Sequence, residues 1–125
     1  MRNIPHFVAI VFLCLLVTGC YETFPPIQSG NVTHWQNGRP QGSAQQLTPE
    51  QVTNLSVWLQ NHRWGWQSVI ATYLPAINIY VVHSDGTKSS ANLMKKILIV
   101  GQYQRSISEV ERQELLSIMG IQNGG

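Results

Sequence analysis

The sequence is poor in charged residues and has only two cysteines. Asp, Glu, Lys and Arg make up 11% of its 125 residues, less than half of the roughly 25% in an average globular chain. The net charge of +2 is too small to support a nucleic-acid partner or a polybasic membrane contact. The four histidines include no HxH or HxxxH pair, the spacings that favour a histidine metal site. We therefore expect no nucleic acid, no metal and no cofactor.

Both cysteines, Cys14 and Cys20, lie near the N-terminus. Cys14 falls within an apolar run over residues 7–17, which follows the basic residue Arg2. As a helix this run would span roughly 16 Å, about half of a hydrocarbon core near 30 Å. It is thus too short for a transmembrane anchor and fits the apolar region of a signal peptide. A buried core helix is the alternative, which the lack of a polar face disfavours.

The segment ends in Val17, Thr18, Gly19 and Cys20, which resemble the lipobox of bacterial lipoproteins. In that family the cysteine thiol receives a diacylglyceryl group, the preceding peptide is removed and the new N-terminus is usually acylated. The resemblance covers residues 1–20 and implies that Cys20 carries lipid, palmitate included. Because two or three acyl chains anchor a protein effectively permanently, it also implies a membrane-anchored mature chain.

The residues that follow the lipobox bear on location and on chemistry. In Gram-negative lipoproteins of this type, an Asp after the cysteine commonly signals retention in the inner membrane. Tyr21 stands there instead, which implies, for a Gram-negative host, an outer-membrane anchor and a domain facing the periplasm. No cysteine follows Cys20, so a disulfide, a thiolate metal site and a cysteine nucleophile are excluded from that domain.

The composition of the chain predicts its organisation. We expect a signal peptide over residues 1–19, a lipidated cysteine and flexible tether over 20–46, a domain over 47–120 and a tail over 121–125. The tether is predicted because prolines and glycines are frequent there and no apolar periodicity is present. Trp35 is unusual in a linker and either docks on the domain or contacts a partner. We expect the domain to fold without the tether.

Two capping boxes predict the helices of the domain. Thr48 with Gln51, and Ser108 with Glu111, have the spacing in which a hydroxyl and a carboxyl or amide side chain bond reciprocally to the backbone. The first helix is expected to end near His62. The residues of the second helix predicted to face the sheet are Val110, Leu115, Ile118 and Met119, with Gly120 as its C-cap.

The sheet is predicted from β-branched segments and one turn signal. Residues 76–84 predict a strand, followed by Asp85 and Gly86 in a two-residue type I′ turn. The return segment forms either one bulged strand or two short strands, of which residues 97–100 are expected to be buried on both faces. Residues 68–73 add a further short strand. These elements predict an α+β fold: an N-terminal helix, a small antiparallel sheet with a central β-hairpin, and a C-terminal helix.

The sequence favours no catalytic site. His83, Ser84 and Asp85 include the residue types of a hydrolase triad, but neighbouring strand residues point to opposite faces and Asp85 suits the turn. A triad also needs a buried carboxylate behind the imidazole. The acidic residues of the last helix serve its cap and its dipole. We therefore expect that the protein is not an enzyme.

Aromatic residues gather around one arginine after the first predicted helix. Trp58 lies on the apolar face of that helix and is expected in the core. Arg63, Trp64 and Trp66 follow the helix, and Trp and Arg are enriched in binding hot spots because they bury a large area and keep a polar group. We predict that Arg63, Trp64 and Trp66 form a binding site, with core filling by Trp64 or Trp66 as the alternative.

Together these observations favour a binding protein of the cell envelope. They predict an outer-membrane-anchored lipoprotein with a small periplasmic binding domain. Its partner would be another envelope protein or peptidoglycan, and its role that of an accessory to an assembly or secretion machine, or of an inhibitor or immunity-type protein. A cell-wall-acting enzyme and a structural spacer lipoprotein are the alternatives.

Overall fold

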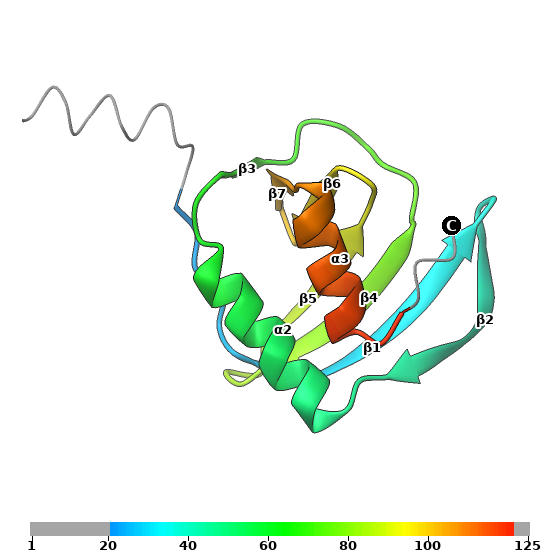
Figure 1. Ribbon diagram of the computed structural model, residues 1–125, viewed down its shortest axis with the longest axis horizontal. Helices are drawn as coiled ribbons and strands as arrows, with labels where there is room; N and C mark the ends of the chain where they lie inside the picture. The colour runs from blue at the N-terminus through cyan, green and yellow to red at the C-terminus, as the bar shows by residue number, and fades with distance from the viewer. Residues whose placement is uncertain (1–20, 122–125) are drawn as a thin grey trace, which may run out of the picture.

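A single antiparallel sheet of seven strands, in the order β2-β1-β4-β5-β6-β7-β3, organises the computed structural model, which describes residues 21–121. The two described helices lie over the same face of this sheet (Figure 1). The α+β class is confirmed, but the sheet is larger than predicted and the domain opens with a hairpin rather than a helix. The strands are β1 (Ile27–Gln36), β2 (Arg39–Gln46), β3 (Trp66–Ser68), β4 (Ile77–His83), β5 (Lys88–Leu93), β6 (Ile97–Val100) and β7 (Tyr103–Ser106), and the helices are α2 (Pro49–Asn61) and α3 (Glu109–Ile118).

The beginnings of both helices are confirmed. The Thr48 hydroxyl accepts a hydrogen bond from the backbone N–H of Gln51 at 3.2 Å, and the Gln51 side chain accepts one from the Thr48 N–H at 2.9 Å. Ser108 and Glu111 repeat this reciprocal pair at the start of α3. These bonds satisfy N–H groups that the first turn of any helix leaves without a partner.

The tether prediction is wrong for residues 27–46, which form the β1–β2 hairpin. β1 pairs with β4 over most of its length and therefore lies inside the sheet, not beside it. Asn37 and Gly38 join β1 to β2 with φ angles of 54° and 74°, and positive φ at both positions is what a type I′ turn requires. An Asn-Gly pair is a strong hairpin signal, so the missed evidence was in the sequence. The predicted signal peptide, Cys20 and residues 122–125 lie outside the described residues.

A bulge in β1 interrupts the alternation of apolar and polar residues that would identify the strand from the sequence. Ile27 and Val32 are buried in the core, yet they lie five residues apart, which a regular alternating strand would place on opposite faces. The pairing of β1 with β4 shifts between Ile27 and Ser29, and such a bulge restores both side chains to the same face. Trp35 lies within this strand and is half-buried, so the docked alternative for this residue holds.

The turn between β4 and β5 differs from the predicted type. Gly86 has a φ of 87°, whereas Asp85 is absent from the positive-φ residues of the described chain. The N–H of Gly86 donates to the His83 carbonyl at 3.0 Å and the N–H of His83 to the Thr87 carbonyl at 2.8 Å. The connection is therefore longer than a two-residue turn, with glycine in its left-handed position. The type I′ prediction is wrong here.

The return segment consists of two short strands, β5 and β6, one of the two predicted alternatives. Their connection carries the exposed Lys95 and Lys96. In β6 only Leu98 and Val100 are buried, so the prediction of burial on both faces is wrong. Of residues 68–73, only Ser68 belongs to a strand, as the last residue of β3.

The core fills the space between the sheet and the two helices. Val110 is an exception to the predicted face of α3, because its side chain is exposed while Leu116 is buried instead. The buried apolar residues are Ile27, Val32, Leu47, Val52, Leu55, Trp58, Leu59, Trp66, Ile77, Ile79, Val81, Ala91, Leu93, Leu98, Val100, Ile107, Leu115, Leu116 and Met119.

Candidate functional site

The segment between Cys20 and β1 is held on the domain. The backbone N–H of Glu22 donates to the carbonyl of Arg63 at 2.9 Å. The ring of Phe24 packs edge-on against the indole of Trp66, with centroids 4.9 Å apart. These contacts fix the chain directly after the lipobox beside the C-terminal end of α2, where Figure 1 shows it running.

Tyr21, Arg63 and Trp64 form an exposed group at this point, which we call the Tyr21 cluster. The Arg63 guanidinium donates from Nη1 to the Tyr21 hydroxyl at 2.9 Å. The rings of Tyr21 and Trp64 are tilted by 59°, with centroids 4.8 Å apart. Tyr21 is 44% exposed and Trp64 46% exposed. Two of the predicted binding residues, Arg63 and Trp64, are thus brought together on the surface with a residue that the sequence did not single out as a contact.

Trp66, the third predicted binding residue, belongs to the core. It is 0% exposed, and its indole N–H donates to the carbonyl of His62 at 2.7 Å. Gly65, with a φ of 89°, turns the chain between Trp64 and Trp66, a conformation that glycine adopts without a steric penalty. The prediction of a three-residue surface site is therefore wrong for Trp66, and the core-filling alternative holds for it.

A network of polar side-chain contacts connects the end of α2 with the start of α3. Trp58 is buried, as predicted, and its indole N–H donates to Glu114 at 3.0 Å. The ring of His62 stacks on Trp58 with centroids 3.8 Å apart. The Glu111 Oε2 atom accepts a hydrogen bond from Arg105 Nη1 at 2.9 Å. The same oxygen lies 3.4 Å from His62 Nε2. These contacts join the helices to β7 and give the network a structural role.

The charge state of Glu111 depends on this network. Partial burial acts to raise the pKa of its carboxyl group, but hydrogen bonds from the Ser108 N–H and from Arg105 outweigh that effect. The pKa therefore lies below its ordinary value of 4.5, and the nearby His62 contributes in the same direction.

His83, Ser84 and Asp85 do not assemble a triad. His83 is 1% exposed, and its Nδ1 lies 2.8 Å from the carbonyl oxygen of Pro25. Because a carbonyl only accepts, Nδ1 carries a proton, while Nε2 lies 2.7 Å from the Ser89 hydroxyl oxygen. The Asp85 carboxylate is exposed in the turn, so no carboxylate lies behind this imidazole as a triad requires.

Asp85 instead stabilises its own turn. Its Oδ1 accepts hydrogen bonds from the Thr87 hydroxyl at 2.6 Å and from the Thr87 N–H at 2.9 Å. These bonds lower the pKa of the Asp85 carboxyl group.

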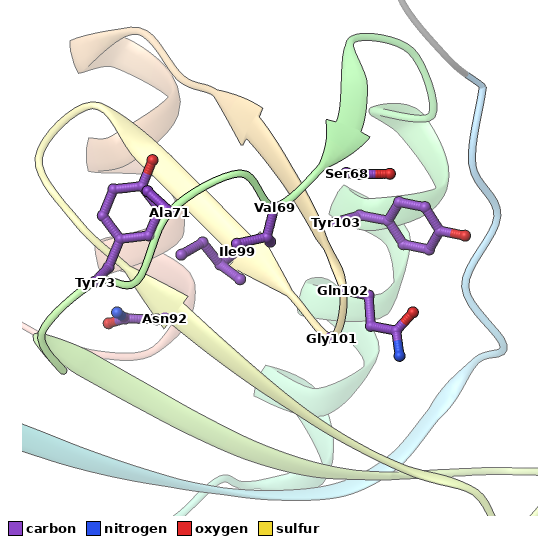
Figure 2. Close-up of a pocket in the computed structure, with 9 residues that line it drawn as sticks. All are labelled: Ser68, Val69, Ala71, Tyr73, Asn92, Ile99, Gly101, Gln102 and Tyr103. Atoms are coloured by element: carbon purple, nitrogen blue, oxygen red, sulfur yellow. The ribbon is translucent and has the colours of Figure 1, made fainter.

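A hollow of about 570 Å³ lies where the loop after β3 crosses the sheet face opposite the helices. Figure 2 shows Val69, Ala71 and Tyr73 of this loop lying over Ile99 of β6. The lining contains hydroxyl, amide and apolar groups and no charged side chain. The residues that line it are Ser68, Val69, Ala71, Tyr73, Asn92, Ile99, Gly101, Gln102 and Tyr103.

The loop is ordered by side chains of the sheet. The Asn92 amide donates to the carbonyl of Leu74 at 3.1 Å and accepts from the N–H of Ala76 at 2.9 Å. The Tyr73 hydroxyl reaches Gln104 at 3.4 Å. The same loop holds Ile70 and Leu74 outward, 81% and 79% exposed. Sequence reasoning missed this site, because only tertiary contacts show that the loop is fixed while these two side chains stay in solvent.

Within residues 21–121, no group of three His, Cys, Asp or Glu side chains is placed to hold a metal ion. Neither helix in that range has the length and hydropathy needed to cross a bilayer. No protein-family model, no curated protein and no solved structure matches the chain.

Proposed function

We propose that the protein is a lipoprotein, anchored through Cys20 in the outer membrane of a Gram-negative host, whose periplasmic domain binds another envelope protein and performs no chemistry. The anchor follows from the lipobox resemblance of residues 17–20. The binding role is supported above all by the outward position of Ile70 and Leu74 on an ordered loop. Each of these side chains leaves most of its apolar area in water, and a partner that covered that area would gain the free energy of its burial.

The hollow beside this loop supports a protein as the partner. Its lining carries no charge, so it does not match an ionic ligand, whereas its hydroxyl and amide groups suit the backbone of a peptide segment. An apolar side chain of the partner could pack on Ile70 or Leu74 at the rim. A peptide contact of this kind needs no catalytic group. The buried His83 and the half-buried Ser89 lie on the other face of the sheet, the face that the helices cover.

The anchor is tested by metabolic labelling with an alkyne analogue of palmitate. The parent protein should be labelled and processed, and Cys20→Ala should be neither, because the thioether cannot form. Cys14→Ala is the matched control and should be labelled like the parent. Label on the Cys20→Ala protein would contradict the lipobox assignment.

The partner surface is tested with a photo-crosslinking amino acid placed at Ile70, at Leu74 or at Tyr80 in the full chain. Tyr80 is 51% exposed on β4 and serves as the control. We expect protein adducts from the two loop positions and none from Tyr80. Adducts with peptidoglycan alone would mean that the partner is the cell wall and not a protein. An absence of adducts at both loop positions would argue against a binding module.

A further inference from the structure

The Tyr21 cluster lies next to the predicted site of lipidation. Tyr21 directly follows Cys20, and consecutive Cα atoms are about 3.8 Å apart. Tyr21 is held in turn by Arg63 and Trp64 through the hydrogen bond and the ring contact described above. Lipid chains on Cys20 would therefore enter the bilayer one residue away from the cluster, with no tether between them.

The chemistry of the cluster matches the interfacial layer of a phospholipid membrane. Tyr and Trp are enriched at that depth because their rings are apolar and their O–H or N–H groups are polar. Arg extends an apolar stem and places its charge near lipid phosphates. Of the five N–H donors of Arg63, one is used by Tyr21 among the hydrogen bonds of the described residues, which leaves donors for phosphate oxygens.

We propose that the Tyr21 cluster inserts into the headgroup layer of the membrane and binds phospholipid phosphate through Arg63. This inference rests on the proposed lipid anchor. It also gives Arg63 and Trp64 a membrane contact rather than a protein contact. The backbone N–H of Glu22 donates to the Arg63 carbonyl, and the formal charges of these two residues cancel. Zwitterionic phospholipid therefore supplies the phosphate, and an excess of anionic lipid is not required.

This contact would set the orientation of the domain. The cluster lies next to β3 in the chain, and β3 is one edge strand of the sheet. The other edge strand, β2, lies six strand spacings away. At about 4.8 Å per strand this is roughly 29 Å. Figure 1 shows the start of the described chain, drawn in blue, on the side of the domain opposite β2. With the Tyr21 cluster in the headgroups, β2 would point away from the membrane.

The experiment uses the full, lipidated protein in phosphatidylcholine vesicles whose acyl chains are brominated close to the glycerol. Bromine quenches a tryptophan only at short range, and iodide in the buffer quenches one exposed to water. The contribution of Trp64 is the difference between the parent and Trp64→Phe. We expect this contribution to be quenched by the brominated lipid and protected from iodide, and Arg63→Gln to lose part of that lipid quenching.

A matched control places a tryptophan of similar exposure away from the anchor. Tyr80 lies on β4, four strand spacings from β3, so Tyr80→Trp in the Trp64→Phe background should be quenched by iodide and not by brominated lipid. Vesicle flotation reports the anchor separately. A protein that floats while Trp64 responds only to iodide would overturn the insertion and leave the anchor intact. Failure of the protein to float would contradict both the proposed lipid anchor and the insertion that rests on it.

Discussion

Phe24 packs edge-on against Trp66, with their planes at 71° and their centroids 4.9 Å apart. Phe24 lies in the segment that leads from Cys20, and Trp66 is fully buried in β3. The contact therefore packs the segment that follows Cys20 against the core. A lipid on Cys20 would hold the domain against the membrane instead of at the end of a flexible linker.

The first prediction concerns the boundary of the domain. A chain beginning at Leu47, which the sequence alone predicts to be a folded unit, should show no cooperative unfolding transition. It lacks β1, which pairs with β4 and contributes Ile27 and Val32 to the core. A chain of residues 21–121 is the control and should unfold cooperatively in urea. Cooperative unfolding of the shorter chain would show that β1 is dispensable.

The second prediction separates the two neighbouring tryptophans. Trp66→Ala should cost about 3–5 kcal/mol of unfolding free energy, because it empties a fully buried site. Trp64→Ala should stay within about 1 kcal/mol, since its side chain is half in solvent. Urea denaturation of both proteins gives the comparison. Equal losses would mean that Trp64 also belongs to the core.

The third prediction concerns His83. His83→Ala should cost about 2–4 kcal/mol, because it leaves a cavity and deprives the Pro25 carbonyl and the Ser89 hydroxyl of their partner. Ser84→Ala changes an exposed side chain of the same segment and should stay within about 0.5 kcal/mol. Thermal unfolding read beside complementation of the cellular phenotype tests this pair. Loss of function in a fully stable Ser84→Ala protein would support a hydrolase with Ser84 as its nucleophile.

The fourth prediction concerns acid stability. The pKa of Glu111 is lower in the folded chain than its ordinary value of 4.5, so the unfolded chain binds the proton more tightly between the two values. The stabilisation by Glu111 is therefore complete above pH 4.5 and is lost as the pH falls through the folded pKa. Compared with Glu111→Gln, the parent should be more stable at neutral pH by about 0.2–1 kcal/mol, and this difference should shrink on acidification. Urea denaturation at a series of pH values measures it, with Glu50→Gln, an exposed carboxylate in the first turn of α2, as the control.

The features that could be predicted from the sequence rest on local contacts. Both helices begin where the capping boxes place them, because the reciprocal bonds join residues three positions apart. Strand β4 lies within the predicted range for a similar reason, since its alternating burial is a property of seven consecutive residues. The core position of Trp58 follows from the face of its own helix.

The features that could not be predicted from the sequence depend on residues far apart in the chain. β1 is a strand because β4 supplies its hydrogen bonds from residues 77–83, and a bulge hides its apolar period from the sequence. Trp64 and Trp66 are chemically identical and two residues apart, so composition could not assign one to the surface and one to the core. Gly65 turns the chain between them, and Phe24 and the His62 carbonyl complete the buried site around Trp66 alone. The exposed indole of Trp64 is left beside Tyr21 because the segment after Cys20 packs there.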